Sequence, residues 1–146
     1  MRATQQVRYA IYGIFDLAYH GGSRPVSLVE VGRRQAIPAR YLEQIFQKLR
    51  RAGLVTSKRG PGGGYQLARR PDAISLRDVV RAVQGSVLTL SQLDKERSEQ
   101  SPEFVWPLIR AGVEEALAQH SVADLCREAA ERGILRAALD PASYEI

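Results

Sequence analysis

The chain has 146 residues, of which 45% are apolar and 25% are charged, so it can form a core of ordinary globular composition. It contains no run of roughly 18 apolar residues, which excludes a membrane-spanning helix. The start of the chain, residues 1–6, has neither the apolar segment nor the cleavage site of a leader peptide, so we expect a cytoplasmic protein. Cys126 is the single cysteine, which excludes an internal disulfide and a zinc site built from several thiolates of one chain.

The charge is distributed unevenly along the sequence. Residues 1–85 contain 15 Lys and Arg against five acidic residues, whereas residues 86–146 contain six against eleven. The net charge of +5 therefore combines a cationic first part with an anionic second part. Such a first part predicts a polyanionic partner, most commonly nucleic acid. A basic surface that meets only solvent is the alternative.

Three helices are expected in the first third of the chain. Residues 5–19 have apolar positions three and four apart and are predicted to form a helix, with Thr4 as its N-cap. This helix should stop at His20-Gly21-Gly22, where a positive charge on His20 would interact favourably with the helix dipole. Residues 27–30 have the pattern of a capping box and begin a short helix that ends near Gln35. A third helix follows Pro38 and ends at Gly53. Its predicted buried stripe consists of Leu42, Ile45, Phe46 and Leu49.

A hairpin and a fourth helix are expected next. Residues 54–58 and 65–68 are strand-like, and residues 59–64 between them contain four glycines and Pro61, which is typical of a hairpin tip. This glycine-rich segment is not a phosphate-binding loop, because no Gly-Lys-Ser/Thr follows it. After Pro71, residues 75–78 have the pattern of a capping box and begin a helix that extends to about Gln84.

The last third of the chain is expected to form a polar linker and two more helices. A long helix should extend from Pro102, or from Pro107 if that residue interrupts it, to His120, and a last helix should extend from Ser121 to Gly133. The long helix carries an apolar stripe that a small domain cannot cover alone, so we expect it to pair with a second copy of the chain. The predicted dimerisation residues are Val105, Leu108, Ile109, Gly112, Val113, Ala116 and Leu117.

This order of elements predicts a winged helix-turn-helix, mainly α with a small β-hairpin wing, followed by a long dimerisation helix. The predicted organisation is a DNA-binding domain at 1–85, a linker or sensor loop at 86–101, the dimerisation helix and C-terminal helix at 102–133, and a tail at 134–146. Double-stranded DNA is therefore the expected partner.

The exposed face of the third helix carries groups that match base edges, since Arg can pair with guanine, Gln with adenine and Glu with cytosine. Basic residues farther along this helix and in the hairpin suit phosphates, and the glycines allow close approach of the backbone. The predicted DNA-binding residues are Thr4, Arg40, Tyr41, Glu43, Gln44, Lys48, Arg51, Lys58, Arg59, Gly60, Gly62, Gly63 and Gly64.

Four stretches of this sequence, residues 8–10, 41–50, 53–55 and 59–65, resemble the Rrf2 family of bacterial regulators, which has IscR-, NsrR- and CymR-like members. The likeness covers residues 1–85 closely and 104–126 loosely. It implies a homodimeric repressor that binds a pseudo-palindromic operator, with Tyr41, Glu43, Gln44 and Arg59 on the DNA. Many relatives have serines where this chain has Pro38 and Arg40, so the resemblance does not predict the operator sequence.

Members of this family that hold an iron–sulphur cluster use three cysteines, in some cases with a histidine, before the dimerisation helix. Residues 86–103 contain neither residue type, and Gln100 and Glu103 stand where cluster-bearing members have their last cysteine and their histidine. Carboxylates cannot replace a set of thiolates. We therefore expect no cofactor and no metal site, and a small-molecule effector or a partner protein as the signal.

Two other functions stay open at this point. One is a noncanonical metal or redox sensor that uses Cys126 or acidic ligands, although a lone cysteine most simply fills the core. The other is a protein-interaction module with incidental DNA binding. An enzyme is not expected, because the two dispersed histidines and one cysteine form no nucleophile–base pair.

Overall fold

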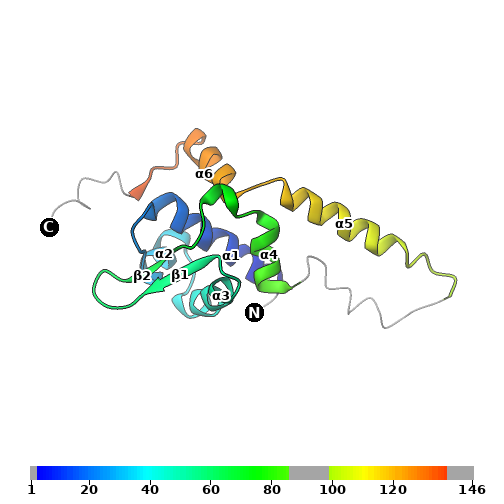
Figure 1. Cartoon of the computed structure of the whole chain (residues 1–146), viewed down its shortest axis with the longest axis horizontal. Coiled ribbons are helices and arrows are strands. Elements are labelled where there is room, and N and C mark those ends of the chain that lie inside the picture. Colours follow the sequence, from blue (N-terminus) through cyan, green and yellow to red (C-terminus); the bar gives the residue numbers. More distant parts are fainter. Residues whose placement is uncertain (1–2, 86–98, 138–146) are drawn as a thin grey trace.

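The computed structural model describes residues 3–85 and 99–137. Helices α1 to α4 and α6 form one compact body with a two-stranded hairpin at its edge, and α5 projects away from this body (Figure 1). The predicted fold class, mainly α with a β-hairpin wing, is confirmed. Within the described residues, none of the helices has the length and apolar character needed to cross a membrane.

The first helix differs from the prediction at both ends. Helix α1 comprises Ala3–Asp16, so Thr4 lies inside the first turn, and its assignment as N-cap is wrong. At the other end the chain continues as a π-helical turn, η1 (Leu17–Gly21), before Gly22. The wider π turn changes which side chains face inward, and Leu17, Tyr19 and His20 are all buried.

Helices α2 (Leu28–Gln35) and α3 (Ala39–Arg51) form the helix-turn-helix. Ser27 caps α2, because its hydroxyl accepts a hydrogen bond from the Glu30 amide at 3.2 Å. The turn is tight: Ala36 adopts a left-handed conformation with φ 57°, and a Cβ at Gly32 would lie 2.6 Å from the Ile37 carbonyl oxygen. Glycine at position 32 therefore allows α3 to follow α2 closely.

The predicted apolar stripe of α3 forms the centre of the core. Leu42, Ile45, Phe46 and Leu49 are completely buried, as are Ala10 and Ile14 of α1. Helix α4 (Leu76–Gln84) covers this core with the buried valines at positions 79, 80 and 83, and it begins at a complete capping box between Ser75 and Asp78. Full burial of each large apolar side chain contributes about 1.5–3 kcal/mol, so the orientation of α3 is strongly determined.

Strands β1 (Val55–Lys58) and β2 (Gly64–Leu67) pair antiparallel, with Val55 opposite Leu67 and Lys58 opposite Gly64. We call residues 55–67 the wing. Tyr65 also exchanges two main-chain hydrogen bonds of 2.8 Å with Val26, the residue just before α2. The wing is therefore attached to the helix-turn-helix at both β1 and β2.

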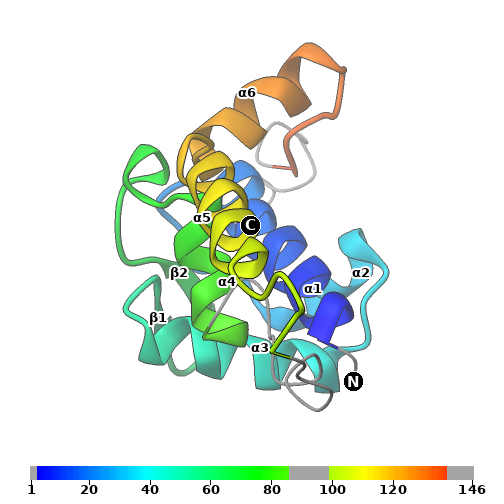
Figure 2. The same cartoon turned by 90° about the vertical axis from the view of Figure 1, so that its right-hand side faces the viewer.

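Helices α5 (Val105–Ala118) and α6 (Val122–Glu131) have different surroundings. Pro107 lies in the first turn of α5 and does not interrupt it. None of the residues of α5 is buried, whereas Val122 of α6 is completely buried in the core. Helix α6 thus packs on the body formed by α1 and by the 3₁₀ turn η2 (Pro71–Ala73), and Figure 2 shows it at the opposite end of the body from α3. The predicted linker residues 86–98 and tail residues 138–146 lie outside the described residues.

Residues 134–137 lie against η1. The Tyr19 hydroxyl donates a hydrogen bond to the Ile134 carbonyl, and the Ala137 amide donates one of 2.9 Å to Nδ1 of His20. Burial lowers the pKa of His20, and Arg34 and Arg136 lower it further, while Asp16 opposes this change. Burial therefore favours the neutral imidazole, which opposes the predicted role of His20 as a cation at a helix end.

Candidate nucleic-acid interface

The exposed face of α3 lies opposite the buried stripe. Arg40, Glu43 and Gln44 are exposed near the start of this helix, which follows Pro38 directly. The core holds the other face in place, so these three side chains share one direction and are free to meet a partner. This is the arrangement in which a recognition helix presents its N-terminal residues to base edges.

Tyr41 is held in place by two neighbours. Its ring stacks on that of Tyr9 in α1, with 6.1 Å between centroids, and the Arg40 guanidinium lies 4.7 Å from its ring centroid. Arg40 Nη2 also donates a hydrogen bond of 3.0 Å to the Tyr41 hydroxyl, and Gln5 Nε2 donates one of 2.9 Å to the Tyr9 hydroxyl. The prediction of site residues did not include Tyr9 and Gln5, because their part is to support Tyr41 from another helix.

Lys48 connects α3 to α1, since its Nζ donates a hydrogen bond of 2.8 Å to Oε1 of Gln6. An ammonium group has three donors, so this bond leaves two for a phosphate. Arg51 is exposed at the end of α3. Thr4 is exposed in the first turn of α1, next to Gln5 and Gln6, and this end of α1 therefore lies beside the recognition face.

The glycines of the wing have two different roles. A Cβ at Gly63 would lie 2.2 Å from the Lys58 carbonyl oxygen, and one at Gly64 would lie 2.3 Å from the Val26 carbonyl oxygen. Gly63 and Gly64 are thus required by the packing of the wing itself. At Gly60 and Gly62 φ is +94° and +74°, and an added Cβ would meet nothing within 4 Å. These two glycines leave the tip open to a partner, beside the exposed Lys58 and Arg59.

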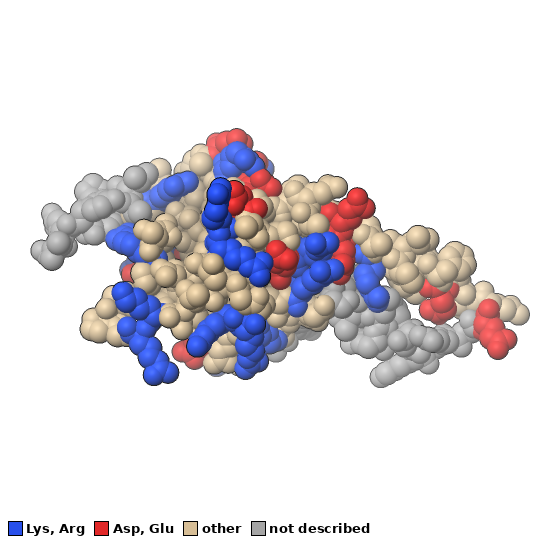
Figure 3. All heavy atoms as spheres, in the orientation of Figure 1, with Lys and Arg blue, Asp and Glu red and all other residues tan. Residues whose placement is uncertain are grey.

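The basic side chains of the site share one edge of the molecule. Figure 3 shows Lys and Arg along the edge where α3 and the wing lie in Figure 1, and most Asp and Glu over α5 and α6. The predicted residues of α3 and the wing therefore belong to one cationic surface.

A helix that exposes base-reading groups, next to a basic hairpin with an open glycine tip, defines a winged helix-turn-helix DNA-binding protein. Comparison with known proteins gives the family. The model of the Rrf2 family, described as an iron-dependent transcriptional regulator, matches residues 3–128. The chain belongs to the Rrf2 family and is a DNA-binding transcription regulator.

Relatives and solved structures agree with this family. A protein of Azotobacter vinelandii named as HTH-type transcriptional regulator ORF2 is 41% identical over 141 residues, which cover 93% of this chain and 85% of that protein. The HTH-type transcriptional regulator IscR of Vibrio cholerae is 51% identical over 87 residues, 60% of this chain and 50% of its own length. The matched region thus spans about half the length of the curated IscR relatives.

Two solved structures have the same fold. The structure of T. potens IscR has a TM-score of 0.75 and 34% identity, with 93% of each chain covered. That of CymR, the global cysteine regulator of B. subtilis, has a TM-score of 0.73 and 32% identity, and the match covers 88% of this chain and 98% of that one. The names of the family and of these relatives are those of transcriptional regulators and not of enzymes.

The family description raises the question of an iron site. Residues 3–85 and 99–137 contain no group of three His, Cys, Asp or Glu that could hold a metal ion. The one thiol, Cys126, is half-buried in α6 against the core, and burial raises its pKa, which favours the thiol over the thiolate that iron would need. The described residues therefore do not fit an iron–sulphur cluster.

Proposed function

We propose that this regulator acts in the cytoplasm as a homodimeric repressor that binds a pseudo-palindromic operator. The observation that carries this proposal is the exposed polar face of α3, held beside the basic tip of the wing. Two copies related by a twofold axis would place two such faces on successive turns of the major groove, which is how dimers of this class read two half-sites.

In this proposal the predicted residues divide by the part of the DNA that they contact, except Gly63 and Gly64, which serve the packing of the wing. Arg40, Glu43 and Gln44 contact base edges in the major groove, and Tyr41 lies between them and α1. Arg59 enters the minor groove with the open glycines Gly60 and Gly62. The remaining cations of the surface bind phosphates, which gives affinity without sequence preference. These phosphate contacts are Lys48, Arg51 and Lys58, with Thr4 beside them.

The dimer is supported by the character of α5. Leu108 is 67% exposed, Ile109 42% and Val113 37%, and the helix projects from the body of the protein (Figure 1). An apolar stripe of this kind is stabilised by a partner helix. Together with Val105, Gly112, Ala116 and Leu117, these residues form the proposed dimer contact.

The proposed regulator has no family-type iron–sulphur cluster and responds to a small molecule or to a partner protein. The support for this part is the sequence, which contains one cysteine and so cannot supply three thiolates from one chain.

One preparation tests these proposals together. The protein is purified without oxygen, its absorbance spectrum and iron content are measured, and DNA fragments are selected from genomic DNA with the same sample. We expect a colourless, iron-free dimer that selects a palindrome. A brown protein with stoichiometric iron would contradict the absence of a cluster, and selection without sequence preference would contradict the operator.

The role of the wing has its own test. Arg59→Ala should lower operator affinity at least tenfold, because it removes the cation at the exposed tip. Arg132→Ala is the matched control, since Arg132 is also an exposed arginine and lies just after α6. Affinity is measured by fluorescence anisotropy at fixed salt, because phosphate contacts make it depend on salt. Equal affinities of the two variants would exclude Arg59 from the interface.

A further inference from the structure

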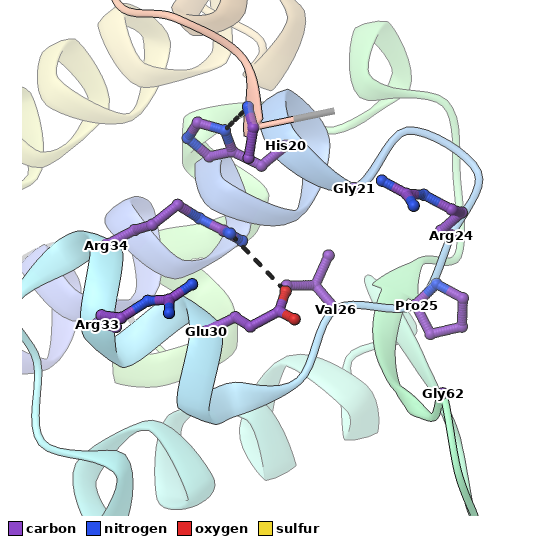
Figure 4. A pocket seen from close by; sticks show the side chains of 10 residues that line it. His20, Gly21, Arg24, Pro25, Val26, Glu30, Arg33, Arg34 and Gly62 are labelled. Atoms are coloured by element: carbon purple, nitrogen blue, oxygen red, sulfur yellow. Dashed lines mark hydrogen bonds and ion pairs between the residues drawn. The ribbon is translucent and has the colours of Figure 1, made fainter. Parts of the chain in front are cut away.

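A cavity of about 620 Å³ lies between η1, the loop that follows it, α2 and the tip of the wing. Figure 4 shows Arg24 on one side of it, Arg33 and Arg34 on the opposite side, and His20 at its top. Ligand sites for small molecules commonly have volumes of about 300–1,000 Å³, so the cavity has the size of such a site. It is separate from the exposed face of α3.

Arg34 is already engaged in the fold. Its guanidinium binds Asp16, which is completely buried, through hydrogen bonds of 2.7 and 3.0 Å, and it lies 3.7 Å from the Glu30 carboxylate. The charge of Arg34 is thus compensated by Asp16, and Glu30 is the one carboxylate among the cavity residues. Arg34 fixes α2 to the end of α1 and forms part of the cavity wall.

Arg24 and Arg33 differ from Arg34 in their exposure and in their partners. Both side chains are exposed, and within residues 3–85 and 99–137 neither makes an ion pair. They extend toward the cavity from opposite sides, Arg24 from the loop after η1 and Arg33 from α2 (Figure 4). Two guanidinium groups therefore face one hollow with their positive charge uncompensated by the protein.

The rest of the lining suits an organic molecule. Pro25 and Val26 supply apolar surface. Nδ1 of His20 accepts the hydrogen bond from the Ala137 amide, so the neutral ring carries its proton on Nε2. The lining thus combines cations with apolar surface and a neutral imidazole.

We propose that this cavity binds a small organic anion with two acidic groups, one held by Arg24 and the other by Arg33. A guanidinium binds a carboxylate or a phosphate through two parallel hydrogen bonds, which gives both strength and orientation. Two such groups on opposite sides select a molecule that carries an acidic group at each of two ends.

Binding of an anion in this cavity should affect DNA binding, and this consequence rests on the proposed function. Gly62 of the wing also lines the cavity. A bound anion would place negative charge against the tip that we propose to bind DNA, so it should lower DNA affinity, and DNA should lower affinity for the anion by the same factor.

Isothermal titration calorimetry of the full chain with citrate, and separately with pyrophosphate, tests the binding site itself. Citrate tests the organic anion and pyrophosphate tests the spacing of two acidic groups alone; we expect one site per chain for citrate, and at least a tenfold loss of affinity in Arg24→Ala and in Arg33→Ala. Arg69→Ala is the matched control, because Arg69 is exposed and does not line the cavity. Thermal unfolding confirms that each variant is folded. Absence of binding by both probes, or equal binding by all the variants, would overturn the proposal.

A second set of measurements distinguishes a cavity that binds a free anion from a cavity that binds a phosphate of the DNA backbone. Operator affinity is measured with and without the bound probe at equal ionic strength, and again for Arg24→Ala and Arg33→Ala without probe. Lower affinity with the probe supports the proposal. If neither probe binds and both variants lose affinity with a reduced salt slope, the cavity holds a DNA phosphate, and the proposal is wrong. If the probe binds but the chain selects no operator, the proposed function fails and the anion site stands.

Discussion

The side chains on the exposed face of α3 contribute nothing to the core, so DNA contact is free to determine their chemistry. Gln44 is exposed, whereas its neighbour Ile45 is completely buried. One turn of helix thus contains a residue that stabilises the fold and a residue that is free to read a base. Substitutions at these two positions should therefore affect different properties of the protein.

Gln44→Ala should relax base preference at one step of the operator by about 1–3 kcal/mol, because the amide can pair with both N6 and N7 at the major-groove edge of adenine. Gln119→Ala, at the exposed end of α5, is the matched control and should leave base preference unchanged. Competition binding with operators that differ at single positions measures the effect. An unchanged base preference in Gln44→Ala would argue against direct readout by this residue.

His20 gives a prediction about pH. Burial lowers its pKa below the usual value of about 6.5, so the unfolded chain binds the proton more readily than the folded chain. The contribution of neutral His20 to stability is therefore present above about pH 6.5 and is lost as the pH falls below it. In His20→Asn, which keeps an acceptor for the Ala137 amide, the free energy of unfolding should fall less steeply between about pH 6.5 and 5.

Urea denaturation at a series of pH values measures this slope. His120→Asn is the matched control, because His120 is exposed. Asp16, Arg34 and Arg136, whose charges act on His20, are present in every variant, so the variants differ only in the residue at position 20 or 120. Identical slopes in His20→Asn and in the unaltered chain would contradict the prediction.

At the scale of elements, the wing shows how one glycine-rich run serves both fold and function. Gly64 lies where β2 meets the Val26 segment, and Gly62 lies at the open tip. Both have positive φ, so both favour glycine, but the backbone crowds an added Cβ at Gly64 alone. The two positions form a matched pair for separating stability from binding.

Gly62→Ala should cost about 1–2 kcal/mol, the strain of a left-handed conformation in a residue with a Cβ. Gly64→Ala should cost more, because its Cβ would also displace the Val26 carbonyl and loosen the wing from the helix-turn-helix. The free energy of unfolding from chemical denaturation measures both effects. Equal losses of stability would show that the contact between β2 and the Val26 segment is less tight than the structure indicates.

At the scale of the whole molecule, α5 is the helix whose apolar side chains are left exposed in a single chain. Its contact with the body includes the ion pair between Arg81 and Glu114, at 2.5 Å, and its exposed apolar side chains have no cover within the described residues. A second chain would bury them. The same contact would set the distance between two copies of α3, and so the spacing of half-sites on DNA.

Leu108→Glu should convert the proposed dimer to a monomer at micromolar concentration, because it places a carboxylate in the apolar contact. Light scattering after size-exclusion chromatography measures the mass. Leu135→Glu is the matched control, since Leu135 is 83% exposed and lies outside α5. A Leu108→Glu variant that is still dimeric would show that another surface forms the dimer.

The features predicted from the sequence are those that depend on residues close together in the chain. The capping box at Ser75 and the stripe of α3 need only neighbours three or four positions away, and the hairpin needs its glycine run. The predicted first strand is one residue longer than β1 at its start, and the predicted second strand is shifted by one residue relative to β2. These local patterns therefore determined the winged helix-turn-helix, its recognition face and the family resemblance.

Other features needed the tertiary structure, because they join residues far apart in the chain. Asp16 is buried with the guanidinium of Arg34, and residues 134–137 bind η1 across more than 100 positions. The periodicity of the sequence does not predict such contacts, because the burial of a charged side chain depends on a partner that is distant in the chain. The sequence by itself thus determined a DNA-binding helix-turn-helix with a basic wing. Only the tertiary structure decided that α6 joins the core while α5 does not, and that Arg24 and Arg33 face one cavity, because packing brings these segments together.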